Sequence, residues 1–171
     1  MLSQQMQEAL NDQINAEYFS SYLYLSMAAH CEAINLQGFG NWLRVQAQEE
    51  MFHAMKFFDF VLERGGRVTL QALDAPQAEW ESPLAIFEAT LEHEQYITGR
   101  INKLVDLAIA ESDHASNAFL QWFVNEQVEE EATADGILQQ LKLMQSAPGG
   151  LFMMDRELGA RTFTPPADAG T

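Results

Sequence analysis

The sequence contains a single cysteine, Cys31, so it cannot form an internal disulfide or a cysteine-based metal cluster. A chain without disulfides fits a reducing compartment, which favours the cytoplasm. The N-terminal residues lack the basic stretch and apolar core of a signal peptide. The longest early uncharged stretch, 18–31, is shorter and more polar than the about 20 apolar residues that span a bilayer. We therefore expect a soluble, cytoplasmic protein.

Positive charge is also scarce. The sequence has nine lysines and arginines and 25 acidic residues, which gives a net charge of −16. Such a chain repels nucleic acid and anionic membranes and attracts cations, so we expect neither nucleic acid nor membrane as a partner. A length of 171 residues with 47% hydrophobic residues suits a single globular domain over 1–171 with a sizeable core.

Proline and glycine are confined to a few places, which leaves four long stretches free of proline. Ser82-Pro83 is typical of a helix start, Gly65 is typical of a helix end, and alternating strand patterns are nearly absent. The sequence therefore predicts an all-α protein. We expect helices at about 4–33, 38–64, 83–111 and 115–145, then a short fifth helix at about 150–159 and a flexible tail from about 164.

The connections between these helices differ in length. The first and second helices, and the third and fourth, are joined by only a few residues, which favours antiparallel pairs. The segment 65–82 between the second and third helices is long enough to run the length of a bundle. This pattern predicts a four-helix bundle with one long crossover.

Each long helix carries one apolar stripe, and each stripe has a glutamate near its middle: Glu17, Glu50, Glu94 and Glu130. In antiparallel helices of similar length the midpoints meet at one level, so these carboxylates converge inside the bundle. A buried hydrogen-bonded network is the simpler explanation for a single polar residue, such as Thr98 or Gln46. It fails for four glutamates, because buried, uncompensated carboxylates cost several kcal/mol each or take up protons.

The stripes contain no lysine or arginine that could neutralise these carboxylates. Two divalent cations would balance the four negative charges. His53 lies three residues after Glu50, so both side chains share one helix face and can reach one ion. Gln127 lies at the same level on the fourth helix. Carboxylates with one imidazole suit iron or manganese, and the sequence predicts a site for a pair of such ions.

Four segments together resemble one family, the bacterial-type non-haem ferritins: QINAEYFSSYLYLSMA, NWLRVQAQEEMFHAMKFFDFV, ERGGRV and FLQWFVNEQVEEE. The resemblance runs from the first helix to about residue 166. It implies a ferritin-like fold and a dinuclear iron centre.

The resemblance also implies a role for each site residue. Glu17, Glu50 and His53 would bind the first iron, and Glu50 would bridge to the second, held by Glu94 and Glu130 with Gln127 alongside. Tyr24 would form a hydrogen bond near the site and supply an electron, with Trp122 close by.

A third iron site is implied by the resemblance at Glu49, Glu126 and Glu129, with Glu130 shared. Composition alone favours a solvated acidic face at Glu126, Glu129 and Glu131. Haem is not expected, because bacterioferritins carry a second Glu-x-x-His on the fourth helix, where this chain has Gln127-x-x-Glu130. His30, His93 and His114 lie off the polar level and are expected at the surface.

The function implied by the resemblance is iron storage and detoxification. The chain would act as a ferroxidase, oxidising Fe(II) with O2 or H2O2 and storing it as a ferric mineral. Storage would take place inside a homo-oligomeric shell of twenty-four subunits, with the fifth helix at a subunit contact. The alternative is a soluble di-iron oxidoreductase acting on peroxide or an organic substrate, which needs a substrate pocket beside the metals.

Overall fold

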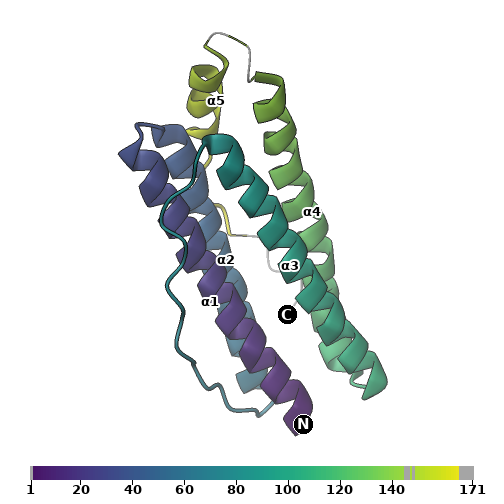
Figure 1. Cartoon of the computed structure of the whole chain (residues 1–171). Helices are drawn as coiled ribbons and strands as arrows, with labels where there is room; N and C mark the ends of the chain where they lie inside the picture. Colours follow the sequence, from purple (N-terminus) through teal and green to yellow (C-terminus); the bar gives the residue numbers. More distant parts are fainter. Residues whose placement is uncertain (1, 145–146, 148, 166–171) are drawn as a thin grey trace.

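The structure, a computed structural model, describes residues 2–144, 147 and 149–165. Within these residues the chain forms five helices and no strand (Figure 1). The bounds lie within one residue of the ranges expected from the sequence, apart from residue 145 and the tail beyond 165, which fall outside the described residues. The helices are α1 (Gln4–Ala33), α2 (Gln37–Glu63), α3 (Pro83–Ala110), α4 (His114–Met144) and α5 (Gly150–Leu158).

Short polar side chains and one glycine fix the helix ends. The hydroxyl of Ser3 accepts a hydrogen bond from the backbone N–H of Met6 at 2.9 Å, and Ser82 does the same for Ala85 at 3.1 Å. Both contacts satisfy N–H groups that the first helical turn leaves free. Gly65 ends α2 with a φ of +72°, a left-handed conformation that glycine adopts without strain.

The helices form the bundle that the sequence predicts. α1 packs along α2, and α3 packs along α4. The segment 64–82 leaves the end of α2 and runs the length of the bundle to the start of α3, as the teal trace in Figure 1 shows. This is a four-helix bundle with one long crossover, and α5 packs against the start of α2.

The core is divided into two apolar clusters with a polar layer between them. On α1 the sequence passes from the apolar Met6–Ile14 region through Glu17 to the apolar Tyr24–Cys31 region. Each of the other three long helices likewise has a glutamate between a stretch in one cluster and a stretch in the other. Each fully buried apolar side chain contributes roughly 1.5–3 kcal/mol. The two clusters therefore hold the four helices in register and fix the level at which the glutamates meet.

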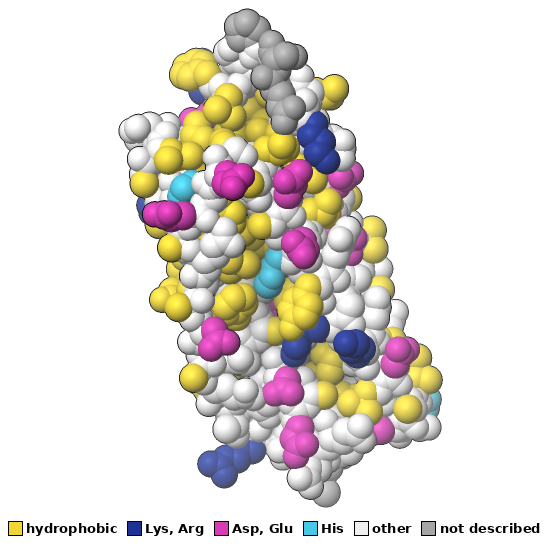
Figure 2. Space-filling model, viewed as in Figure 1, with side chains coloured by type: hydrophobic (Ala, Val, Ile, Leu, Met, Phe, Trp, Pro, Cys, Tyr) yellow, Lys and Arg dark blue, Asp and Glu magenta, His cyan; other side chains and the backbone are white. Residues whose placement is uncertain are grey.

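α5 buries Met154 and Leu158 against the bundle but leaves three consecutive apolar side chains exposed. Leu151, Phe152 and Met153 have exposed fractions of 40%, 66% and 71%. Figure 2 shows hydrophobic side chains gathered at this end of the molecule. None of the helices in the described part of the chain is long and apolar enough to cross a membrane.

Candidate metal centre

Six polar side chains meet in the layer between the two apolar clusters, and each is at most 7% exposed. Every long helix supplies at least one of them. The helix register explains this convergence, because each residue lies on the same stripe as the apolar residues above and below it. They are Glu17 from α1, Glu50 and His53 from α2, Glu94 from α3, and Gln127 and Glu130 from α4.

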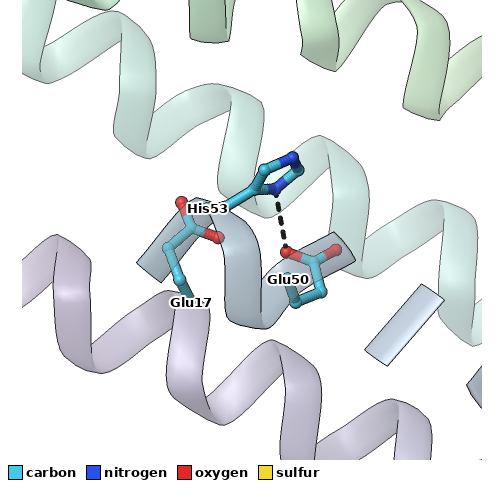
Figure 3. Close-up of side chains that lie close together, drawn as sticks. All are labelled: Glu17, Glu50 and His53. Atoms are coloured by element: carbon cyan, nitrogen blue, oxygen red, sulfur yellow. Dashed lines mark hydrogen bonds and ion pairs between the residues drawn. The ribbon is translucent and has the colours of Figure 1, made fainter. Parts of the chain in front are cut away.

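Glu17, Glu50 and His53 form the tightest group, with one ligand atom from each lying within 4.8 Å of the others (Figure 3). The His53 Nδ1 atom lies 3.3 Å from Oε2 of Glu50. Figure 3 shows the Glu17 side chain coming from α1 and those of Glu50 and His53 from α2, with the dashed line joining Glu50 to the nearer ring nitrogen of His53. The spacing of Glu50 and His53 on one helix face thus produces the arrangement that the sequence predicts.

Two atoms of this group have no hydrogen-bond partner among the described residues: Oε2 of Glu17 and Nε2 of His53. Both are buried, so water does not solvate them from the surface. Buried polar atoms in folded proteins are nearly always paired. The buried Glu17 oxygen without a partner, in a group whose ligand atoms already lie close together, therefore fits a metal ion as the missing partner.

Glu94 is held from two sides. The Tyr24 hydroxyl donates a hydrogen bond to its carboxylate, and the Gln127 amide donates to Oε2 of Glu94 at 3.3 Å. Burial, followed by the nearby Glu94 and Glu50, raises the pKa of Tyr24 well above its usual range. Tyr24 therefore remains a hydrogen-bond donor at neutral pH and orients this carboxylate.

Burial dominates the electrostatics of the centre. It raises the pKa of Glu17 to about 8, with a further contribution from Glu50. It also raises the pKa of Glu130 to about 8 and that of Glu94 to about 7. The pKa of Glu50 lies well above its usual range because of burial and the neighbouring Glu94 and Glu130. Without a metal ion these carboxyl groups therefore hold on to their protons, and divalent cations would replace the protons and stabilise the ionised carboxylates.

The acids expected at a third site are placed differently from one another. Glu126 and Glu130 lie with His53 in a second group of ligand atoms within 4.8 Å. The Glu49 carboxylate forms an ion pair with Arg161 instead, and Glu129 is exposed. Burial raises the pKa of both Glu49 and Glu126. The structure therefore brings Glu126 to the edge of the centre and gives Glu49 a different partner.

Two glutamine–arginine pairs that hold the carboxylates were not predicted from the sequence. The Gln13 amide donates to Glu17 at 2.7 Å and accepts from Nε of Arg100 at 2.9 Å. Gln46 donates to Glu130 at 2.7 Å and accepts from Arg161 at 2.9 Å. One signal was available: Gln13 precedes Glu17 by four residues, as Gln46 precedes Glu50, which is the spacing of neighbours on a helix face.

The expectation for His93 was wrong. Its Nε2 atom lies 2.7 Å from the Ser20 hydroxyl, and its ring packs against Tyr24 and Phe19. Burial lowers the pKa of His93 to about 4, so it is neutral. The ring lies beside α1 because α3 turns this residue inward, next to Glu94. His114 is exposed, as expected, and His30 is partly covered by the Trp80 ring.

The chain matches the family model described as "Ferritin-like domain" over residues 7–144. It is 44% identical to a protein named bacterial non-heme ferritin from Bacteroides fragilis (strain 638R), over 94% of this chain and all of that one. It is 39% identical to a protein of the same name from Staphylococcus aureus (strain USA300), over 95% of this chain and 98% of that one.

Solved structures agree with these relatives. An engineered closed form of the Archaeoglobus fulgidus ferritin superimposes with a TM-score of 0.95 at 55% identity, covering 96% of this chain and all of that one. The open-pore ferritin of the same archaeon gives a TM-score of 0.93 at 55% identity, over 95% of this chain and 99% of that one. The family model, the full-length relatives and the shared fold agree: this chain belongs to the ferritin family.

Proposed function

We propose that the buried carboxylate centre is a ferroxidase site and that the protein stores iron. The observation behind this proposal is the buried group of Glu17, Glu50 and His53, in which Oε2 of Glu17 has no partner among the described residues, with the buried carboxylates of Glu94 and Glu130 in the same layer. Hard carboxylate oxygens with a single imidazole suit iron. The relatives named non-heme ferritin support the same substrate.

The charges explain how such a site would favour oxidation. Four ionised glutamates carry four negative charges, which balance two ferrous ions and bind two ferric ions more strongly still. Each Fe(II) gives up one electron, and the two electrons with two protons reduce O2 to H2O2. The carboxylates are fixed in place by Gln13, Gln46, Tyr24 and Gln127, so little reorganisation accompanies the change in iron charge.

The side chains around the carboxylates have distinct roles in this proposal. Glu17, Glu50 and His53 hold one iron, and Glu94 and Glu130 hold the second with Glu50 shared. Gln127 steadies Glu94 and presents its carbonyl oxygen at the same level. Trp122 lies against His53, with ring centroids 5.5 Å apart, where it is close enough to supply an electron together with Tyr24.

We further infer that the protein works as a homo-oligomeric shell of twenty-four subunits in the cytoplasm. The exposed apolar side chains of α5, Leu151, Phe152 and Met153, support assembly because isolated chains rarely leave such a group in water. The "open pore" and "closed form" in the names of the Archaeoglobus structures support a hollow assembly.

The alternative function, oxidation of an organic substrate, needs a cavity that reaches the carboxylates. A cavity of about 330 Å³ opens between α3 and α4. Gln127 lines it, together with Thr98 and Val124, but the four central glutamates are absent from its walls in the described part of the chain. We therefore favour iron itself as the substrate.

Size-exclusion mass measured together with iron loading tests this proposal. With a subunit mass of 19.3 kDa, we expect an assembly of about half a megadalton that takes up many more than two irons per subunit under air. The excess iron reflects mineral in the interior. A monomer or dimer that saturates at two irons would contradict storage and favour the oxidoreductase alternative.

A further inference from the structure

The chain after α5 returns to the bundle and lies along α2. In Figure 1 this segment, drawn in yellow, runs from α5 toward the middle of the molecule beside α2. The Asp155 carboxylate accepts hydrogen bonds from the backbone N–H groups of Gly38 at 2.8 Å and Phe39 at 3.1 Å. It thereby caps the start of α2, whose N-cap residue Leu36 makes no side-chain cap of its own.

Close backbone packing holds both α5 and the segment after it against α2. A Cβ atom added to Gly38 would lie 1.6 Å from the carbonyl oxygen of Asp155, so only glycine allows this approach. Further along, the Asn41 side-chain amide donates to the carbonyl oxygen of Arg161 at 2.9 Å. Residues 155–161 are thus bound to α2 at several points, and this fixes where the Arg161 side chain begins.

The Arg161 guanidinium reaches the edge of the metal centre. It lies 4.3 Å from the centroid of the Trp42 ring, and Nη1 donates to the Gln46 carbonyl oxygen at 2.9 Å. Nη2 donates to the Glu49 carboxylate. The Arg161 and Glu49 side chains are 23% and 19% exposed, so water screens this ion pair only partly. Planar guanidinium groups suit such a stacked, two-partner contact.

Two features of the centre depend on this contact. Gln46 is fully buried and donates to Oε2 of Glu130 at 2.7 Å, so the arginine fixes the glutamine that fixes a proposed iron ligand. Glu49 is an acid expected to bind a third iron, and the guanidinium already occupies its carboxylate. A cation bound between Glu49 and Glu126 would therefore have to compete with Arg161 for the Glu49 carboxylate.

We propose that Arg161 is a positioning residue that acts as a built-in cation at Glu49, so that the dinuclear centre fills first and a third cation binds only by displacing the guanidinium. This inference rests on the proposed function of the centre. In this proposal the C-terminal segment 155–161 serves to place the Arg161 side chain beside the metal site. The order of filling follows from charge, since one positive charge a few ångströms away repels a divalent ion in a partly screened site.

Calorimetric titration of the metal-free protein with Co2+ tests the inference by binding, without any oxidation. We expect the wild-type chain to show two strong binding steps per subunit and a weaker third. In Arg161→Gln the third step becomes at least about tenfold tighter, because the competing charge is gone. Arg161→Lys keeps the charge, so its third step stays close to that of the wild type. A purely structural role for Arg161 would make both variants behave alike.

Two controls sharpen the test. Arg44→Gln removes another arginine that pairs with a glutamate, Glu32 at 3.3 Å, away from the centre, and is expected to leave the third step unchanged. Adding Glu49→Gln to Arg161→Gln should abolish the gain, because the freed carboxylate is lost. A third step that is unchanged in Arg161→Gln, or equally tightened in Arg44→Gln, would overturn the inference while the first two steps remain. If the wild type and all variants alike lack the two strong binding steps, the proposed function is overturned as well.

Discussion

Glu50→Ala is expected to slow the oxidation of ferrous iron by about 100-fold or more while the assembly remains folded. Glu50 is the carboxylate common to both halves of the centre. It lies 3.3 Å from His53 and within ligand distance of Glu17, and the charges of Glu94 and Glu130 act on it from the other side. Removing it therefore takes a ligand from both proposed iron positions at once.

Stopped-flow absorbance after mixing the metal-free protein with ferrous iron and air measures this effect. His53→Ala should also lose fast oxidation, since it removes the imidazole ligand of one position. Glu63→Ala is the matched control, because Glu63 is an exposed glutamate on the same helix and should oxidise iron at the wild-type rate. Far-ultraviolet circular dichroism and size-exclusion mass verify the fold. Oxidation within threefold of wild type in both Glu50→Ala and His53→Ala would contradict the assignment.

The second large effect concerns the stability of the metal-free protein, which should fall as pH rises from about 5 to about 9. The folded-state pKa values of Glu17 and Glu130 are raised to about 8 and that of Glu94 to about 7, from a usual value of 4.5. Carboxyl groups with raised pKa bind protons more strongly in the folded state than in the unfolded state. Their contribution is therefore fully present below about 4.5 and is lost as pH passes through 7 to 8.

Divalent cations should reverse this loss. With saturating Co2+ we expect the unfolding temperature at pH 9 to rise by about 10 °C or more, and much less at pH 5, where protons compete for the same oxygens. Scanning calorimetry at both pH values, with Co2+ or with a chelator, measures the difference. A stabilisation by Co2+ that is equal at pH 5 and pH 9 would show that the ions bind elsewhere.

Glu17→Gln separates the buried centre from the acidic surface. With a net charge of −16, surface repulsion also grows as pH rises, and it would weaken the metal-free protein in the same direction. The glutamine replaces one buried titrating group by a neutral side chain of similar shape. The variant should therefore lose less stability between pH 5 and pH 9 than the wild type. An identical pH dependence would place the effect on the surface.

Helical periodicity was sufficient to predict the bundle and the residues that meet inside it. Ser82-Pro83 and Gly65 marked helix ends, and the long segment 65–82 marked the crossover. The central glutamates were visible because a carboxylate is costly on an apolar stripe, so its repeated appearance at one level needs a cause. In the structure one ligand atom from each of Glu17, Glu50 and His53 lies close enough to the others for all three to hold one ion, as their spacing indicated.

The side chains that hold the carboxylates were not predictable in the same way. Arg161 lies outside the four long helices, and its contact with Gln46 depends on how residues 155–161 fold back onto α2. No local pattern encodes that return path. His93 was misplaced for a related reason: it precedes Glu94 by one position, and whether it faces solvent depends on how closely α1 and α3 approach each other. Tertiary packing decides both positions.

Anomalous diffraction at the iron absorption edge, from crystals loaded with ferrous iron without oxygen, would locate the metal ions relative to the buried glutamates. We predict two iron peaks inside each subunit. One should lie among Glu17, Glu50 and His53, and the other among Glu50, Glu94 and Glu130. Iron found only on exposed acids, with the space between these buried side chains empty at saturating iron, would contradict this prediction.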